Sequence, residues 1–251
     1  AQTILAFGAH ADDCEIGVGG LLLQAVQAGS RVVLVTVVGG FDSWALTQGR
    51  AEETKRELTA VAQKYGFEKR FLDYPYHVLD GGDLELKRAL ARIYLEVKPG
   101  IAFIHQPDDL WPDHVACGRA AQDAVLFAHG LSGDVRAPQC PHVYAYVVTP
   151  LQTTRFDADT CFDVSGVMPQ YMELINETVA AYHRTALEEE IVHEFKSRGA
   201  RPQALRMGKI ALTRLAYCIQ HGHRAGCDYA VGLKTVWGGR RKAFSELLLN
   251  P

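Results

Sequence analysis

Hydrophobic and polar residues follow two periods along the first 130 residues of this chain. Short β-branched runs such as 31–38 have the length and composition of buried strands, and the segments between the runs repeat apolar residues at the helical period. This pattern predicts strands at 3–8, 31–38, 70–73 and 101–104, and helices at 17–29, 47–65, 84–97 and 115–125. The alternating order predicts an α/β fold with a mainly parallel sheet and helices on both faces.

The second half of the chain is less regular. It predicts strands at 143–148 and 160–164, helical stretches between 169 and 221, a strand or loop at 229–237 and a helix at 240–249. No repeat, low-complexity segment or linker divides the sequence. We therefore expect a single domain, 1–251, in which 1–130 is the core that carries the motifs and 131–251 adds further strands and helices.

Histidines and aspartates gather directly after two of the predicted strands. The strand at 3–8 is followed by Ala9-His-Ala-Asp-Asp-Cys-Glu15, and the strand at 101–104 is followed by an Asp- and His-rich segment, 105–114. The carboxyl ends of parallel strands meet at one edge of a sheet, where such sheets bind ligands. The sequence therefore predicts one site at that edge.

The types and spacing of these residues favour a zinc site. A catalytic zinc has three nitrogen or oxygen ligands from the protein and one water. His10 and Asp13 are three residues apart on a turn and can face one ion, and His114 is the best third ligand, while Asp12 can reach a water on the metal. The alternative for the first cluster is a polar turn in which an Asp caps a helix. The second cluster on the same edge favours the metal.

Three motifs in this order resemble a known family. They are Ala9-His-Ala-Asp-Asp-Cys-Glu15 followed by Gly19-Gly20, Arg50-Ala-Glu-Glu53, and Asp109-Leu-Trp-Pro-Asp-His114. Over about 1–130 the chain resembles the LmbE-like, or PIG-L, family of zinc-dependent N-acetylglucosaminyl deacetylases. The resemblance implies a Rossmann-like fold, a homo-oligomer (trimer or hexamer), His10, Asp13 and His114 as zinc ligands, and Asp12 as the general base.

The sequence departs from the family pattern at Trp111. Family deacetylases commonly have a histidine there, which stabilises the oxyanion or protonates the leaving amine. An indole N–H can donate a hydrogen bond but cannot act as an acid. His142, Tyr144 and His105 are the candidates for the missing polar group.

Four further residues are predicted to support the site. We expect Asp113 to orient a ligand or its partner rather than to bind metal. We expect Arg50, Trp111 and His142 to contact the substrate. For Arg50, an ion pair with Glu53 or Glu15 is an equal alternative, and for His142 the alternative is a backbone hydrogen bond at a strand start.

These features together predict a zinc-dependent hydrolase that removes an acetyl or other acyl group from the nitrogen of an amino sugar or related small amide. The alternative is a metal-dependent hydratase or lyase that acts on an unsaturated carboxylate, and the change at Trp111 keeps this alternative open. The dinucleotide fingerprint Gly-x-Gly-x-x-Gly does not follow the first strand. A purely nucleotide-binding role is therefore disfavoured.

Composition restricts the partners. The chain is 48% hydrophobic and 22% charged with a net charge of −3, which gives no basic footprint for nucleic acid. No apolar run approaches the roughly 18 residues that span a bilayer. The six cysteines form no CxxC pair, and no secretory signal is visible, so free thiols in the cytoplasm are expected. The expected partner is a small molecule, an N-acetylated sugar or conjugate, rather than nucleic acid or membrane.

Overall fold

A seven-stranded sheet forms the centre of the fold, with neighbouring strands in the order β3-β2-β1-β4-β5-β9-β6. The computed structural model describes residues 2–134, 136–148, 156–183, 191–195, 203–239 and 243–249. The strands of the sheet are β1 (Thr3–Gly8), β2 (Arg31–Thr36), β3 (Phe67–Phe71), β4 (Ile101–His105), β5 (His142–Tyr146), β6 (Thr160–Asp163) and β9 (Ala230–Trp237). All pairs from β3 to β5 are parallel, and β9 is antiparallel to both of its neighbours. The predicted α/β fold is confirmed.

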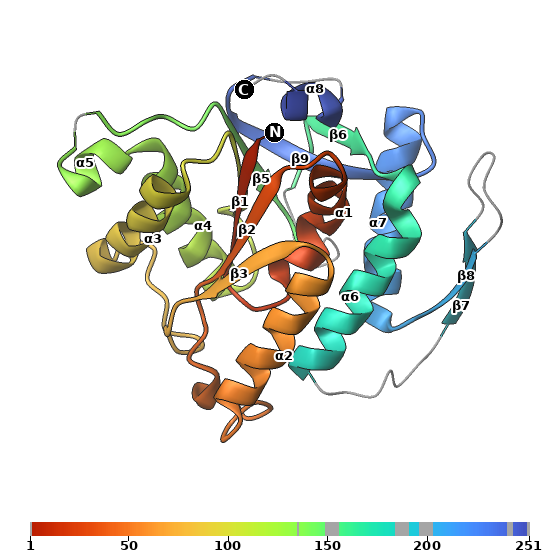
Figure 1. Ribbon diagram of the computed structural model, residues 1–251, viewed down its shortest axis with the longest axis horizontal. Helices are drawn as coiled ribbons and strands as arrows, with labels where there is room; N and C mark the ends of the chain where they lie inside the picture. The colour runs from red at the N-terminus through yellow and green to blue at the C-terminus, as the bar shows by residue number, and fades with distance from the viewer. Residues whose placement is uncertain are drawn as a thin grey trace.

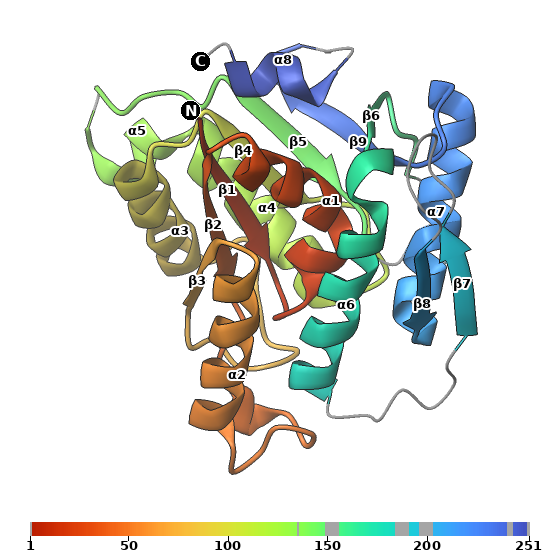
Figure 2. The same ribbon diagram turned by 45° about the vertical axis from the view of Figure 1, so that its right-hand side comes forward.

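Helices cover both faces of the sheet (Figure 1; Figure 2). One face carries α1 (Asp13–Gln27), α2 (Ala51–Lys64), α6 (Met168–His183) and α7 (Lys209–Ala225), and the other carries α3 (Leu84–Val97), α4 (Pro112–Leu126) and α5 (Ala128–Ser132). Alternate residues of β1 point to opposite faces of the sheet. Ile4 packs in the hydrophobic core on the side of α1 and α6, and Leu5 packs in the core on the side of α3 and α4. Burial on both faces explains the nearly continuous apolar runs of the strands.

The chain changes its direction across the sheet at β1. From there α1 and α2 lead outward to β2 and β3, and α3 then returns the chain to β4, on the other side of β1. The carboxyl ends of β1 and β4 therefore form a topological switch point, the place where α/β sheets bind ligands. The segments 9–12 and 106–111 both begin there.

The glycines of α1 allow close packing rather than open the helix. The helix expected at 17–29 begins at Asp13, so Gly17 and Gly19 lie inside it. A Cβ atom at Gly17 would overlap the ring of Tyr146 on β5, and one at Gly19 would lie 2.8 Å from the ring of Tyr171 on α6. The absence of side chains lets β5 and α6 approach α1 closely.

The helical stretches predicted between 169 and 221 are present, but a pair of strands that was not predicted separates them. Helices α6 and α7 form there, but the antiparallel pair β7 (Ile191–Phe195) and β8 (Gln203–Met207) lies between them. Runs of five residues are too short for periodicity to separate a strand from a helix. Residues 184–190 and 196–202 lie outside the described part. The last helix, predicted at 240–249, is α8 (Phe244–Leu249). Residues 240–242 also lie outside the described part.

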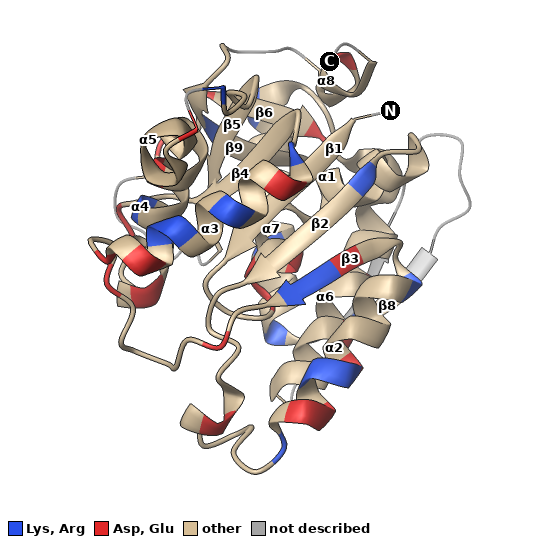
Figure 3. Cartoon of the chain, turned by 60° about the vertical axis from the view of Figure 1, so that its left-hand side comes forward, with Lys and Arg blue, Asp and Glu red and all other residues tan. Residues whose placement is uncertain are grey.

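Charged residues of both signs mix on the exposed helices. Figure 3 shows Lys and Arg interspersed with Asp and Glu along α2 and α3. Pairs one turn apart, such as Lys55 with Glu52 and Arg88 with Glu85, contact each other. Among the described residues, no helix is both long enough and apolar enough to cross a bilayer.

Arg214 joins the second half of the chain to the core. Its side chain is 1% exposed, and its guanidinium donates to the hydroxyl of Tyr171 at 2.9 Å, to the carbonyl of Val147 at 3.0 Å and to the carbonyl of Gly17. These acceptors belong to α6, to the end of β5 and to α1. Burial of the charge is tolerated because its donors are matched. One side chain of α7 thus holds three other elements together.

We expect Arg214→Met to destabilise the fold, because it removes the buried hydrogen bonds to the hydroxyl of Tyr171 and to the carbonyl groups of Gly17 and Val147. The free energy of unfolding should fall by about 2–4 kcal/mol and the melting temperature by roughly 5–10 °C. The same substitution at Arg224, an exposed residue on α7, should cost less than about 0.5 kcal/mol. Thermal unfolding followed by circular dichroism measures both, and equal losses would contradict the assigned role of Arg214.

Candidate active site

Three buried side chains converge where β1 and β4 end. His10 lies on the turn after β1, Asp13 begins α1, and His114 lies in the first turn of α4. His114 Nε2 lies 3.2 Å from His10 Nδ1 and 3.4 Å from Asp13 Oδ1, and His10 Nδ1 lies 3.7 Å from Asp13 Oδ2. In a tetrahedral zinc site with bonds near 2.1 Å, neighbouring ligand atoms lie about 3.4 Å apart. The residues present therefore fit a zinc ion.

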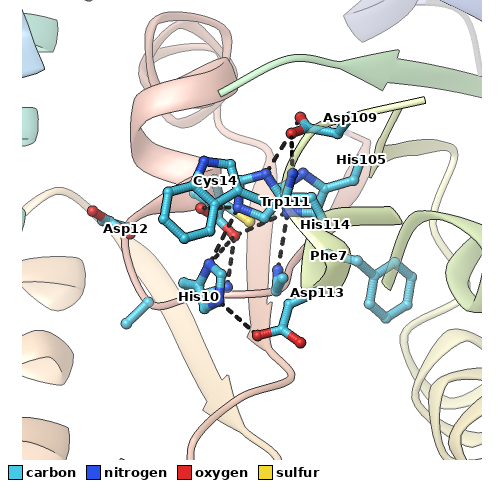
Figure 4. A network of polar contacts seen from close by, with 12 residues as sticks. Phe7, His10, Asp12, Cys14, His105, Asp109, Trp111, Asp113 and His114 are labelled. Carbon is cyan, nitrogen blue, oxygen red and sulfur yellow. Dashed lines mark hydrogen bonds and ion pairs between the residues drawn. The ribbon is translucent and has the colours of Figure 1, made fainter. Parts of the chain in front are cut away.

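Two carboxylates contact the imidazoles from outside this cluster. Asp113 Oδ2 lies 3.1 Å from His10 Nε2, and Asp109 Oδ2 lies 3.3 Å from His114 Nδ1. Figure 4 shows the two acids at opposite ends of the cluster. A carboxylate at the outer nitrogen holds the proton there and turns the lone pair of the inner nitrogen toward a metal. Asp113 has the contact that its predicted orienting role requires. The matching contact of Asp109 was not predicted, although Asp109 opens the same sequence motif.

Asp13 is held from the core side. Its Oδ2 atom accepts a hydrogen bond from the His10 backbone N–H at 2.6 Å and lies 2.9 Å from Nε2 of His105, which is fully buried. Burial raises the pKa of Asp13, but His114, His105 and His10 together bring it well below its usual range. Asp13 is therefore a carboxylate. His105 positions it and does not line the cavity, so His105 does not replace the polar group missing at Trp111.

The cluster carries excess negative charge around His114. Burial lowers the pKa of His114, yet the carboxylates of Asp13 and Asp109 outweigh this effect and raise it to about 10. A site that stabilises a proton on this ring to that extent stabilises positive charge in general. A divalent cation would find the same favourable potential.

A buried ion pair fixes the turn that carries the first cluster. Lys69 Nζ on β3 lies 2.5 Å from Glu15 Oε1 and donates to the carbonyl of Ala11 at 2.5 Å. Both charged side chains are 1% exposed. The acidic residue at the end of the first motif therefore has a structural partner.

Asp12 occupies the N-cap position of α1, but its side chain does not cap the helix. Its Oδ2 atom instead lies 3.0 Å from Nε2 of His183, the last residue of α6. Asp12 lines the same cavity as the three candidate ligands, and Figure 4 shows it to one side of the cluster. The helix-capping alternative does not describe this carboxylate, which lines the cavity instead.

The cavity over the cluster has a volume of about 470 Å³, which is suited to a small molecule. Aromatic rings form a continuous wall, since Tyr76 stacks on His10 with ring centroids 4.8 Å apart and on Trp44 at 5.1 Å. Trp44 in turn contacts Tyr182 at 4.9 Å. Trp111 also lines the cavity and is 39% exposed. The predicted placement of Trp111 at the site therefore agrees with the geometry.

The structure does not bring Arg50 or His142 to the cavity. Arg50 Nε donates to Glu53 Oε2 at 2.8 Å, which is the ion-pair alternative for this residue. His142 pairs in register with Ile101 at the amino end of β5, whereas the site lies at the carboxyl ends of the strands. The prediction that His142 contacts the substrate in this cavity is therefore corrected. Tyr144, another candidate from the sequence, packs in the core against Phe103.

His183 is the functional candidate that sequence reasoning missed. It lies 171 positions after Asp12, near the end of a helix in the irregular half of the chain. No motif surrounds it, and only the packing of α6 beside α1 brings the two residues together. The spacing of residues in the sequence therefore gives no sign of this contact.

Known proteins resemble the part of this chain that carries the candidate site. A family model described as "PIG-L: GlcNAc-PI de-N-acetylase" matches residues 5–125. Diacetylchitobiose deacetylase from Thermococcus kodakarensis is 30% identical over 149 residues, a match that covers 51% of this chain and 50% of that protein. The chain therefore matches about half the length of this relative.

Solved structures share the fold over nearly the whole chain. The conserved protein TT1542 from Thermus thermophilus has a TM-score of 0.73 and 21% identity, with 95% of this chain and 96% of that chain covered. N,N'-diacetylchitobiose deacetylase from Pyrococcus horikoshii has a TM-score of 0.72 and 18% identity, with 95% of this chain and 85% of that chain covered. GalB, the 4-carboxy-2-hydroxymuconate hydratase from Pseudomonas putida, has a TM-score of 0.71 and 20% identity, with 94% of this chain and 97% of that chain covered.

The matched family segment contains the whole candidate cluster, from His10 to His114, together with Asp12. The sequence motifs, the arrangement of the carboxyl-end residues and the family match agree. Over residues 5–125, this chain is similar to the PIG-L family.

Proposed function

We propose that this protein is a zinc-dependent hydrolase that removes an acetyl group, or another acyl group, from the nitrogen of an amino sugar or related amide. The observation that carries the proposal is the buried triangle of His10, Asp13 and His114, with Asp12 beside it in one cavity. The deacetylase relatives support the choice of an N-acyl bond.

The residues divide the chemistry between them. Zinc, held by His10, Asp13 and His114, would supply a Lewis acid for the carbonyl group. Asp12 takes a proton from the attacking water, because its carboxylate faces the cavity without capping α1. Asp113 holds the ring of His10, and Asp109 that of His114.

The wall of the cavity favours a substrate with a flat, weakly polar face. Trp44, Tyr76, Tyr182 and Trp111 all line the cavity. Aromatic rings offer a large contact area with a few polar atoms at their edges. We therefore propose an N-acetylated sugar or conjugate that places one ring face on this wall.

Hydration of an unsaturated carboxylate is the second candidate function. Trp111 lacks the acid that amide cleavage needs, and Lys209, which lines the cavity at the start of α7, would pair with a substrate carboxylate. A hydratase shares the fold across 94% of the chain. Acetate release, described below, separates the two candidates.

We also propose that the protein acts in the cytoplasm as a homo-oligomer, a trimer or hexamer. All six cysteines are described and all are free thiols, as a reducing compartment would keep them. Large apolar side chains, among them Leu46, Leu110 and Phe127, are exposed on the single chain and would suit subunit contacts.

We expect the purified protein to bind one zinc ion per chain. His114→Ala removes one of three ligands and should weaken zinc binding by more than about 100-fold. His129→Ala, at an exposed position on α5, should leave the affinity unchanged. Metal analysis and competition with a chromogenic chelator measure both variants. Wild-type affinity in His114→Ala would contradict the ligand assignment.

We expect acetate release from one or more members of a panel of N-acetyl sugars and aryl N-acetylglucosaminides, and we expect a chelator to abolish it. Asp12→Asn keeps the size of the side chain but removes the base, so kcat should fall by about 10²–10⁴-fold with zinc content unchanged. Acetate release that resists the chelator would contradict the metal mechanism. No acetate from any substrate, together with hydration of an unsaturated dicarboxylate, would favour the second candidate.

We expect Asp113→Asn to lower zinc affinity or kcat/KM by about 10–100-fold, because the amide cannot hold the proton of the His10 ring as a carboxylate does. Asp108→Asn is the matched control, since Asp108 is exposed on the loop that precedes α4. Zinc competition and initial rates give the comparison. Equal behaviour of the two variants would show that Asp113 does not orient His10.

A further inference from the structure

The site described so far has a base but lacks an obvious acid. Cleavage of an amide requires a proton on the departing nitrogen, because an amide anion is a very poor leaving group. Trp111 stands three residues before His114, and its indole cannot release a proton. Two of the cavity histidines, His10 and His114, are already assigned to the metal. The acid must come from another part of the cavity.

His183 is the cavity residue in direct contact with the base. Its Nε2 atom lies 3.0 Å from Asp12 Oδ2, and its side chain is 25% exposed. Its ring stands edge-on to Trp44, with centroids 5.3 Å apart at 90°, and contacts Tyr182 at 4.9 Å and 68°. The two aromatic rings fix the imidazole so that Nε2 faces Asp12. Two other cavity residues with a nitrogen that can carry a proton, His77 and Lys209, are both exposed.

The surroundings of His183 favour its protonated form. Burial lowers the pKa of this imidazole, but the hydrogen bond and the charge of Asp12 outweigh the burial and raise it. His183 also ends α6, a helix of 16 residues, whose carboxyl end stabilises positive charge. A protonated His183 therefore pairs with the Asp12 side chain on the cavity wall.

We propose that His183 is a catalytic residue that donates the proton to the departing amine, in the place of the histidine absent at position 111. The inference rests on the proposed amide hydrolysis. It assigns the base and the acid of one reaction to two residues that already share a hydrogen bond.

The proton balance closes within this pair. As the water oxygen bonds to the acyl carbon, one water proton passes to Asp12. When the carbon–nitrogen bond breaks, the electron pair of that bond stays on nitrogen, which receives the Nε2 proton of His183. The products are an amine and a carboxylic acid. Asp12 is then neutral and His183 is neutral, and transfer of the proton from Oδ2 to Nε2 along their hydrogen bond restores the starting state.

A purely structural role for the pair is the competing explanation. In that case the ion pair would tie the end of α6 to the start of α1 and would support every reaction of the site equally. A donor to the leaving group would instead matter only for leaving groups that need a proton. The dependence on the leaving group therefore separates the two roles.

The test compares the best amide substrate with 4-nitrophenyl acetate, whose phenolate departs without a proton. His183→Gln retains an N–H group that can donate to Asp12 but cannot serve as an acid. We expect kcat for the amide to fall by about 10²–10⁴-fold, and kcat for the ester to change by less than about threefold. KM and bound zinc should stay at wild-type values. His129→Gln on α5 is the matched control and should resemble the wild type in all four measurements.

Three results would overturn the inference. Equal losses on amide and ester would assign His183 a supporting role, and wild-type amide hydrolysis by His183→Gln would exclude it as the donor. A wild-type protein that binds zinc but cleaves no amide would overturn the proposed function and this inference with it. The first two results are measured on His183→Gln and the third on the wild type, so failure of this inference can be told apart from failure of the proposed function.

Discussion

The buried ion pair between Lys69 and Glu15 is the contact on which the candidate site depends. It ties β3 to α1, and the same ammonium group holds the carbonyl of Ala11 in the turn between His10 and Asp12. Removing one partner of such a pair leaves an uncompensated charge in the core, which is far costlier than losing a surface pair. The direction in which the turn presents its imidazole and carboxylates is therefore fixed by a charge placed beneath it, on a strand that contributes nothing to the cavity itself.

The fixed turn lets opposite charges share a small volume. Asp13, Asp109 and Asp113 surround the imidazoles of His10 and His114, and each acid faces a ring nitrogen. Asp12 turns away from this group toward His183. The carboxylates thus divide into two groups. Asp13, Asp109 and Asp113 stabilise positive charge at the cluster, and Asp12 remains available to the cavity. This division accounts for two adjacent aspartates, Asp12 and Asp13, having unrelated surroundings.

The part of the site that could be predicted is the part encoded locally. His10, Asp12 and Asp13 share one turn, and the rule for strand ends was sufficient to add His114. His142 was misplaced because a polar residue at the start of a strand looks the same in sequence as one at its end. His183 could not be predicted, since its contact with Asp12 depends on the packing of α6 against glycines of α1. The same limit applies to the pair β7–β8, where five-residue strands carry no decisive period. The order of strands and helices up to 130 was predictable because both faces of the sheet are buried.

Arg214 has a consequence for the residues that reach the cavity from outside the family match. Together with Gly17 and Tyr171, it fastens α6 and α7 onto the core, and those two helices bring Tyr182, His183 and Lys209 to the cavity. The family match ends at residue 125, before either helix begins. The candidate ligands and the wall formed by α6 and α7 thus come from different parts of the sequence. Two chains that both match the family model can therefore differ at Tyr182, His183 and Lys209, which form one wall of this cavity and lie outside the matched segment.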